Sequence, residues 1–378
     1  MNPIQKSMKV FSGTSNRAFA ESVAAKLGTT LGDLQIEKFA NGEIYTRFAE
    51  SVRGCDVFFI QSVSGPHLND MLMEVQIAAD AAKRASARTF TAVLTHYAYA
   101  RQDRKAQPRE PITARLVADL YEAAGVNRVS FGVQSARDSQ LKTLGRPHTA
   151  KQARAAFAAA QRAGFTNISG DIMLALPHYT QAEFDETLEL IENGGATHVS
   201  AYLLKIEPDS AFGRKPPEGL PTSDEAADFY LYAVEQLEHH GYQQYEISNF
   251  ARPGYEGMHN LIYWDCGDYL GLGPAAHSCM GGKRFYYPPD TDAFLHDTAA
   301  PVLDGSCGAE DYLILQLRLR KGLNLEAYKN LYGKEFSTAQ LAFVQNCVKA
   351  GYANFDGKTL ALTPAGLIVQ NTILAELL

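Results

Sequence analysis

The chain has 378 residues, of which 46% are hydrophobic and 20% charged, enough for about two to three ordinary domains with buried cores. Its 35 Lys and Arg residues against 42 Asp and Glu residues give a net charge of −7 without an acidic or basic block, which argues against nucleic-acid and anionic-membrane partners. No apolar run approaches the length of a membrane span, and the opening segment lacks the apolar stretch of a secretory signal, so we expect a cytoplasmic protein.

The first part of the chain alternates short apolar strands with helical patterns. We expect strands at MKVFSG, DVFFIQS and TFTAVLTH, and helices over 16–27, 69–85 and 113–124. This alternation predicts parallel βαβ units with right-handed crossovers. One hairpin interrupts it, because IEKFA and EIYTRF flank Asn41 and Gly42, a pair that tolerates the positive φ angles of a two-residue turn.

The same alternation continues in the second part. Strands are expected at RVSFGVQS, NISGDIMLAL, THVSAYLLKI and YQQYEISNF, with helices over 150–163, 181–193 and 223–240. Residues 255–290 are dense in Gly, Tyr and Pro, which predicts a loop-rich segment that covers a site or an edge.

The end of the chain predicts a small winged-helix-like domain. From residue 308 onward two helices, a helix over 338–350, a hairpin around Asp356 and Gly357, and a last helix over 364–377 follow one another. Folds of this kind often bind DNA, but the few basic residues here favour packing or contact with a partner.

Five cysteines occur in the chain, and their spacing bears on redox state and on metals. They are Cys55, Cys266, Cys279, Cys307 and Cys347, an odd number without a close pair, as expected where thiols stay reduced. Neither a CxxC pair nor a tight group of three is present, so the sequence predicts no zinc or iron–sulfur site.

Residues 8–127 resemble the N-terminal half of the ribose-phosphate pyrophosphokinase (PRPP synthetase) family. The resemblance lies in FANGEIYTRF, in SVSGPHLNDMLMEVQIAADAAKRASA and above all in YARQDRKAQPREPITARLVADLYEAAG. It implies ATP contacts from Phe39, Asn41, Glu43, Arg101 and Gln102, with Mg²⁺ as the companion ion. Arginines and a lysine gathered in one loop suit a triphosphate, because guanidinium groups bind phosphate oxygens in pairs.

A structural interpretation of the same residues stays open. The Asn41-Gly42 pair alone is explained by a hairpin turn, and the basic loop by a solvated surface. The family's metal-binding histidine, its Lys-Arg catalytic loop and its acidic ribose 5-phosphate loop do not appear downstream.

Residues 126–378 resemble a different family, the haem-chaperone type of coproporphyrinogen III oxidase-like radical SAM proteins. The resemblance lies in VNRVSFGVQSARDSQLKTLGRPHTAKQA, DIMLALPHYT, SAYLLKIEPDSAFGR, GYQQYEISNFARPGYEGMHNLIYW and GDYLGLGPAAHS, in the family's order. It implies S-adenosylmethionine contacts from Gln134, Arg146 and Asp171. An arginine can pair with a carboxylate, an aspartate can accept from ribose hydroxyls, and a glutamine offers a donor and an acceptor.

Each of these residues also has a structural interpretation. A Gln at a strand end, an Arg beside a helix start and an Asp leading a buried strand commonly satisfy local backbone groups. For His259, Asn260 and His277, a structural hydrogen bond and a haem or substrate contact are equally open. Gly271 and Gly273 are expected to allow tight backbone turns rather than to bind phosphate.

In the radical SAM family the cysteine motif lies in the N-terminal part of the barrel. In this chain the segment that resembles PRPP synthetase stands in that place. Three thiolates must hold three irons of a [4Fe–4S] cluster, and only Cys55 precedes the junction. Even if Cys266, Cys279 and Cys307 met in space, they would lack the tight local loop that fixes such a site. We therefore expect no reductive cleavage of S-adenosylmethionine and no catalytic residues inherited intact.

These observations combine into one set of expectations. The fold is α/β: a phosphoribosyltransferase-like α/β domain over 1–127, a partial radical SAM (β/α) barrel over 128–300 and a winged-helix-like α+β cap over 301–378. The first function hypothesis is a cluster-less haem-chaperone-like protein that binds haem or a partner. The second is an ATP-binding relative of ribose-phosphate diphosphokinase without a pentose site, and the third is a recombined chain with neither activity. We expect small-molecule partners, and the sequence leaves open whether the chain is a monomer or a homo-oligomer.

Overall fold

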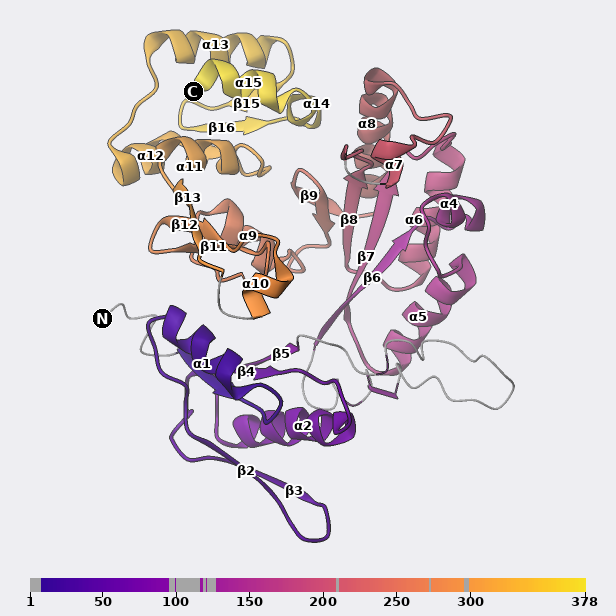
Figure 1. Cartoon of the computed structure of the whole chain (residues 1–378). Helices are drawn as coiled ribbons and strands as arrows, with labels where there is room; N and C mark the ends of the chain where they lie inside the picture. The colour runs from indigo at the N-terminus through magenta and orange to yellow at the C-terminus, as the bar shows by residue number, and fades with distance from the viewer. Residues whose placement is uncertain are drawn as a thin grey trace. The chain divides into compact units, whose positions relative to one another are not determined.

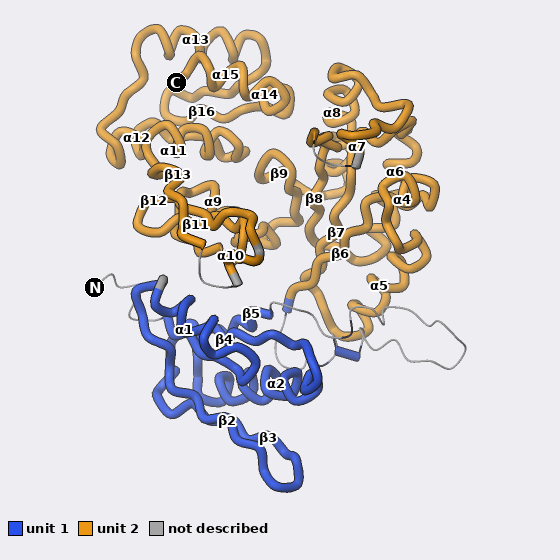
Figure 2. Tube along the Cα trace, in the orientation of Figure 1, with its two compact units in different colours: residues 1–127 blue, residues 128–378 orange. Residues whose placement is uncertain are grey.

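The computed structural model describes residues 8–94, 99, 116–117, 120, 127–208, 211–271, 273–295 and 299–378. The chain divides into two compact units, Met1–Asn127 and Arg128–Leu378, drawn in blue and orange in Figure 2. Within the described ranges, no helix is both long enough and apolar enough to cross a bilayer.

The first unit is a parallel α/β layer with a hairpin attached (Figure 1). Strands β1, β4 and β5 form a three-stranded sheet in the order β1-β4-β5, with both pairs parallel, as the βαβ alternation predicts. The hairpin β2–β3 is antiparallel, but the expected two-residue turn is wrong in detail: Gly42 N–H donates to Phe39 O across Ala40 and Asn41, and of the Asn41-Gly42 pair only Gly42 has a positive φ. The elements are β1 (Met8–Ser12), α1 (Arg17–Lys26), β2 (Leu34–Lys38), β3 (Ile44–Phe48), β4 (Asp56–Gln61), α2 (Leu68–Arg84) and β5 (Thr89–Leu94). The helix expected over 113–124 falls largely outside the described residues.

The core of the first unit lies between the sheet and α2. Phe11, Val57 and Phe59 are fully buried, and Val75 and Ala78 meet them from one face of the helix. Apolar residues at this helical spacing form the buried stripe of an amphipathic helix.

The second unit begins with a partial (β/α) barrel. Its sheet has the order β6-β7-β8-β10-β9, in which β6, β7 and β8 are parallel and β10 is antiparallel to both neighbours. Helices α5, α6 and α8 bury Phe157, Phe184 and Val234 against one face of this sheet. The elements are β6 (Arg128–Gln134), α4 (Asp138–Thr143), α5 (Ala150–Arg162), β7 (Asn167–Leu174), α6 (Gln181–Asn193), β8 (His198–Leu203), α7 (Ala211–Arg214), α8 (Ser223–His239), β9 (Gln243–Glu246) and β10 (Asn249–Ala251).

The single strand expected at YQQYEISNF is a hairpin, so this prediction is wrong in detail. The chain turns between β9 and β10 because the buried carboxylate of Glu246 accepts hydrogen bonds from the Ser248 backbone, at 3.2 Å, and from the Asn249 side chain. These side-chain bonds are not visible in an apolar alternation pattern.

The segment over 255–290 contains more regular structure than expected. Helix α9 (Met258–Trp264) is followed by an antiparallel sheet of order β11-β12-β13. The remaining elements of this part are β11 (His277–Met280), β12 (Lys283–Tyr286), α10 (Thr291–Leu295) and β13 (Val302–Ser306). The many glycines fall in its turns, which explains why the composition indicates a loop.

The C-terminal part packs helices on a small antiparallel sheet of order β14-β16-β15. It has its own cluster of buried side chains, including Leu317, Val344, Leu360 and Leu374. The elements are α11 (Ala309–Gln316), β14 (Leu323–Asn324), α12 (Leu325–Tyr332), α13 (Thr338–Lys349), β15 (Ala353–Phe355), β16 (Thr359–Leu362), α14 (Pro364–Ile368) and α15 (Gln370–Leu377). The last helix is interrupted at Val369 rather than continuous.

Candidate functional site

A row of polar side chains lies on the face of the barrel sheet opposite α5, α6 and α8. Side chains alternate between the two faces of a strand, so apolar residues such as Ile168, Ile172 and Val199 meet the helices while their polar neighbours point the other way. The polar residues come from three neighbouring strands: Arg128, Ser130, Ser169, Asp171, His198 and Ser200. In (β/α) barrels the corresponding face is the barrel interior.

Asp171 lies in the middle of this row on β7. Its Oδ1 accepts a hydrogen bond from Ser130 Oγ at 3.1 Å, and the Ser200 hydroxyl is a second donor. Burial raises the pKa of Asp171, while the two hydroxyls and the charge of Arg128 oppose that rise. The carboxylate therefore has part of its acceptor capacity committed within the sheet.

His198 is held in one orientation by two hydroxyls. Its Nδ1 lies 2.8 Å from Ser169 Oγ and its Nε2 lies 2.9 Å from the Tyr245 hydroxyl, which in turn accepts from the Gly257 backbone N–H. Burial raises the pKa of Tyr245 to about 12, and burial together with the charge of Arg128 lowers the pKa of His198 to about 3. Both groups are neutral near pH 7, so one ring nitrogen of His198 donates a hydrogen bond and the other accepts one, and each has a hydroxyl as its partner.

Gln134 and Arg146 lie beside the carboxyl end of β6. Gln134 is buried and occupies the centre of a tight turn at φ +64°, closed by a 2.8 Å hydrogen bond from Ser135 N–H to the Val133 carbonyl. His148 Nε2 donates to the same carbonyl at 3.2 Å and so ties the segment that follows exposed Arg146 to the end of β6. A positive φ is uncommon for glutamine and is typical of functional strand ends.

The sheet register places Asp171 opposite Gly132, close to Gln134 on the neighbouring strand. Gln134 and Asp171 therefore lie on neighbouring strands, and the segment that carries Arg146 is tied to the end of β6 by His148. No described hydrogen bond or ion pair joins the three side chains directly. Their assignment to S-adenosylmethionine stays a prediction.

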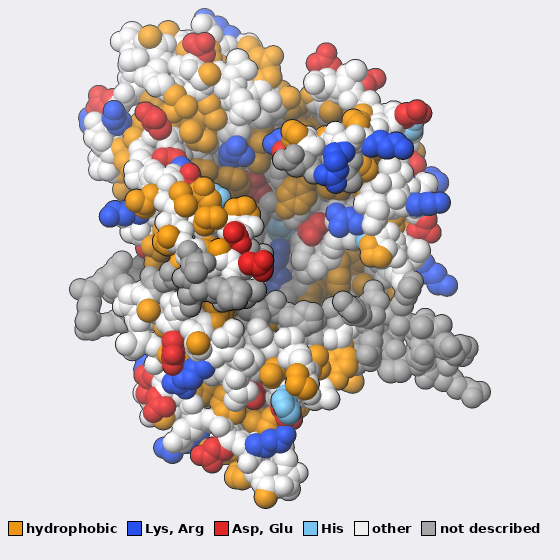
Figure 3. All heavy atoms as spheres, viewed as in Figure 1, with side chains coloured by type: hydrophobic (Ala, Val, Ile, Leu, Met, Phe, Trp, Pro, Cys, Tyr) orange, Lys and Arg blue, Asp and Glu red, His pale blue; other side chains and the backbone are white. Residues whose placement is uncertain are grey.

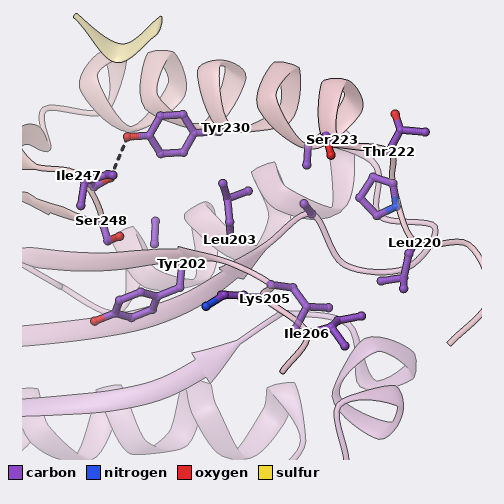
Figure 4. Close-up of a pocket in the computed structure, with 15 residues that line it drawn as sticks. Tyr202, Leu203, Lys205, Ile206, Leu220, Thr222, Ser223, Tyr230, Ile247 and Ser248 are labelled. Carbon is purple, nitrogen blue, oxygen red and sulfur yellow. Dashed lines mark hydrogen bonds between the residues drawn. The ribbon is translucent and has the colours of Figure 1, made fainter. Parts of the chain in front are cut away.

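A separate cavity of about 530 Å³ opens at the carboxyl end of β8 (Figure 4). Its walls come from the end of β8, the start of α8 and the β9–β10 turn, and they are mostly apolar; Tyr202, Lys205 and Tyr230 are among the polar exceptions. The Tyr230 hydroxyl donates to the Ile247 carbonyl at 2.7 Å, as the dashed line in Figure 4 marks, which closes one side. The volume lies within the range of small-molecule sites.

Charge is mixed over the surface that Figure 3 shows. Among the described residues on that face, Lys and Arg side chains alternate with Asp and Glu side chains, and neither sign forms a continuous field. Within the described ranges, no group of three His, Cys, Asp or Glu side chains is arranged to hold a metal ion.

In the first unit, Phe39, Asn41 and Glu43 lie at the tip of the β2–β3 hairpin. The turn is closed by backbone hydrogen bonds from Phe39 N–H to Glu43 O and from Gly42 N–H to Phe39 O, both 2.8 Å, with Gly42 at φ +93°. The Phe39 ring is 51% exposed. Arg101 and Gln102 lie outside the described residues.

The sequence reasoning did not single out Arg128, Ser130, His198, Ser200 and Tyr245. A signal for the first four is present, because RVS, NISGD and HVS place polar residues at every second position of three successive strands. This phase, shared across neighbouring strands, predicts a polar face. The partnership of Tyr245 with His198 depends on the β9–β10 hairpin, which the sequence pattern did not predict.

Three family models match the chain in order. They are the N-terminal domain of ribose phosphate pyrophosphokinase over residues 8–125, the radical SAM superfamily over 67–191 and the HemN C-terminal domain over 309–369. The haem chaperone HemW of Bacillus subtilis is 30% identical over 272 residues, which cover 68% of this chain and 71% of that protein. The chain belongs to the HemW family.

Two further similarities concern the first unit and the fold. A ribose-phosphate pyrophosphokinase of Fusobacterium nucleatum is 53% identical over 122 residues, or 32% of this chain, and the chain spans only 38% of that protein's length. The structure of Escherichia coli coproporphyrinogen III oxidase (HemN), a radical SAM enzyme, matches with a TM-score of 0.62 at 18% identity, covering 86% of this chain and 79% of that one. This HemW-family chain therefore has a HemN-like fold and a PRPP synthetase-like N-terminal part, which confirms both resemblances.

Proposed function

We propose that this HemW-family chain binds haem and does not cleave S-adenosylmethionine. The observation that carries the proposal is the placement of the cysteines. A radical SAM cluster is held by three thiolates from one short motif, whereas this sequence has Cys55 before residue 128 and four widely spaced cysteines after it.

The cysteines of the second unit do not match the ligand set of a [4Fe–4S] cluster. Cys266 follows α9, Cys279 lies in β11 and Cys307 follows β13, so these three come from separate segments. Three such cysteines lack the short loop that holds the thiolates of a radical SAM cluster at fixed distances.

Gln134, Arg146 and Asp171 remain our candidates for contact with S-adenosylmethionine. The amide of Gln134 and the carboxylate of Asp171 lie on neighbouring strands, the segment with Arg146 is joined to β6 through His148, and the three groups suit the polar parts of a nucleoside and an amino acid. Intact S-adenosylmethionine would bind there through these side chains. Calorimetric titration of the chain and of Asp171→Ala tests this assignment, with a loss of heat expected for the variant.

Helix α9 offers the side chains best suited to haem. His259 is exposed, and its neighbours Met258 and Ile262 are 71% and 41% exposed. His259 Nε2 lies 2.8 Å from the Tyr263 hydroxyl, and the tautomer in which Nε2–H donates to that hydroxyl would leave Nδ1 with a free lone pair for iron. An imidazole next to exposed apolar side chains suits an iron porphyrin, since imidazole is a common axial ligand of haem iron.

A haem titration of the full-length chain, followed at the Soret band, tests this proposal. We expect saturable binding and at least a tenfold weaker affinity for His259→Ala, while His239→Ala, which removes another exposed histidine of the same unit, binds as the parent does. Equal haem affinity of the parent and of His259→Ala would show that His259 does not bind the haem iron. Stoichiometric iron and sulfide retained after anaerobic reconstitution, with an EPR signal, would contradict the absence of a cluster.

A second candidate function is ATP binding by the first unit. The observation in its favour is the β2–β3 hairpin, which presents the Phe39 ring to solvent and orders Asn41 and Glu43 by its turn. An exposed aromatic ring can stack on adenine, while Arg101 and Gln102 remain the candidates for phosphate contact.

Calorimetry with Mg-ATP tests this second candidate. We expect binding by the parent and a loss for Phe39→Ala, with Tyr45→Ala, another exposed aromatic of the hairpin, as the matched control. Formation of phosphoribosyl diphosphate from ribose 5-phosphate would show that the pentose site is present after all. No binding of either ATP or haem would favour the recombined chain without inherited activity.

A further inference from the structure

Tyr245 links the start of helix α9 to the barrel sheet. Its hydroxyl accepts a hydrogen bond from the Gly257 N–H at 3.0 Å and lies 2.9 Å from His198 Nε2. Tyr245 belongs to β9 and His198 to β8, so one hydroxyl joins two strands of the sheet to the N-cap residue of α9. Tyr245 itself is neither the proposed haem ligand nor a proposed nucleotide contact.

The hydroxyl of Tyr245 has a fixed place because its partner is itself held. His198 Nδ1 lies 2.8 Å from Ser169 Oγ on β7, and the rings of His198 and Tyr245 pack with their centroids 5.8 Å apart. The His198 side chain is buried, so its ring has little freedom to turn. Residues from three strands of one sheet therefore hold the hydroxyl that meets Gly257.

The contact between Gly257 and Tyr245 leaves no room for a side chain. A Cβ built on Gly257 would lie 2.8 Å from the Tyr245 hydroxyl oxygen and 3.7 Å from His198 Nε2. The φ of Gly257 is −73°, which other residues also adopt, so the close approach requires glycine here and the backbone conformation does not. Among the described residues, no side chain caps the start of α9, which leaves the bond to Tyr245 as the side-chain tie at this end.

Helix α9 is held at both ends, and the tie at its start is the nearer one to the proposed haem ligand. Gln316 of α11 donates to the Trp264 carbonyl at 2.9 Å, which holds the far end. His259 is the second residue of the helix. The Leu261 N–H donates to the Gly257 carbonyl at 3.2 Å, so the first turn, which contains His259, is bonded to Gly257.

We propose that Tyr245 is a positioning residue for haem binding, because through Gly257 it sets where α9 presents His259 to the iron. This inference rests on the proposed function, in which His259 is the axial ligand. Tyr245 acts only through the placement of His259 and does not touch the haem. Without its hydroxyl the start of the helix is less ordered, so haem binding must also order that turn and becomes weaker.

A double-mutant cycle on the full-length chain tests the proposal, with haem affinity measured at the Soret band. We expect Tyr245→Phe to bind haem about threefold to tenfold more weakly than the parent, the effect of one lost hydrogen bond. In the His259→Ala background the same change should have no further effect, because a residue that acts only through His259 then has nothing to position. Tyr242→Phe is the matched control and should bind as the parent does, since its fully buried hydroxyl donates to the Ala196 carbonyl at 2.9 Å rather than to α9.

Gly257→Ala provides a second, independent variant. Its added Cβ would press against the Tyr245 hydroxyl without straining φ, so haem affinity should fall in the same direction as in Tyr245→Phe. Amide hydrogen exchange over residues 258–264 of the haem-free protein should be faster in both variants than in the parent and in Tyr242→Phe. Circular dichroism checks that each variant is folded.

The possible outcomes distinguish a failure of this inference from a failure of the proposed function. If His259→Ala weakens binding but Tyr245→Phe does not, or if Tyr245→Phe weakens binding equally in both backgrounds, the positioning role is overturned and His259 keeps its assignment. A loss in Tyr242→Phe as large as that in Tyr245→Phe would also overturn it, because general destabilisation would then explain both. A parent that binds no haem, or that binds it no better than His259→Ala, would overturn the proposed function and this role together.

Discussion

At the scale of single residues, the polar row of the barrel sheet shows how burial sets charge. Asp171 and His198 lie on neighbouring strands, and burial acts on both against the charged form. The effects on stability have opposite pH dependence. Asp171 becomes charged as pH rises and opposes folding there, whereas His198 would become charged as pH falls and opposes folding at acidic pH.

Replacement of Asp171 by Asn is expected to raise the free energy of unfolding at neutral pH. The pKa of Asp171 is higher in the folded state, so its ionised form opposes folding above that pKa, and the penalty vanishes below the unfolded value of about 3.9. Urea unfolding of the parent and of Asp171→Asn across this pH range measures the effect. Ser130→Ala is the control, since loss of its 3.1 Å hydrogen bond should lower stability by about 0.5–1.5 kcal/mol. A variant less stable than the parent at neutral pH would contradict the argument.

His198 is expected to make the second unit sensitive to acid. Its pKa is lowered to about 3 in the folded state, against about 6.5 unfolded, so the unfolded chain takes up a proton between these values. Stability should fall by at most about 1.4 kcal/mol per pH unit as pH drops from 6.5 toward 3. Urea unfolding of His198→Gln should show a flatter dependence, while His239→Gln, at an exposed position, should follow the parent. Identical slopes for the parent and His198→Gln would disprove the assignment.

At the scale of elements, the β2–β3 hairpin depends on one backbone conformation. Gly42 has a φ of +93°, and a Cβ added there would meet only Lys38 Cε at 3.9 Å, so strain rather than crowding opposes a side chain. Gly42→Ala should therefore lower the stability of the first unit by about 1 kcal/mol. Thermal unfolding measures it, with Gly54→Ala, another uncrowded position of positive φ, as the comparison outside the hairpin. Unchanged Mg-ATP binding by a folded Gly42→Ala would show that the turn does not order the proposed contacts.

The helices of the barrel begin at side-chain caps. The Thr222 hydroxyl accepts from the Glu225 N–H at 3.3 Å while the Glu225 carboxylate accepts from the Thr222 N–H at 2.8 Å. Thr222→Ala should lower the stability of the second unit by about 1 kcal/mol, and Thr222→Ser should restore most of it, as chemical denaturation followed by circular dichroism would measure. Equal stability of the Ala and Ser variants would mean that packing alone holds the start of α8.

At the scale of the whole molecule, hydrophobic periodicity predicted most of the architecture. The parallel strands and the long helices were predictable because each buries one face, and several helices also carry a capping residue, as α6 (Gln181–Asn193) does at Thr180. The β9–β10 hairpin was not, since it depends on the buried Glu246 and its partners. Of the candidate site, Gln134 and Asp171 came from resemblance, whereas the contacts of His198 with Ser169 and Tyr245 require the folded chain.

The repeated Thr caps have a consequence for how such a chain can be assembled. Helices α5, α6 and α8 each start at a threonine whose side chain accepts a hydrogen bond from the backbone N–H three residues later. The capping residue is therefore part of the same segment as its helix. A junction placed just before a strand, as between residues 127 and 128, leaves the threonine caps of these later helices unchanged. A part of a chain that contains its own helix caps can fold after a different N-terminal partner. Joining two unrelated families at this position therefore preserves the local folding signals of both.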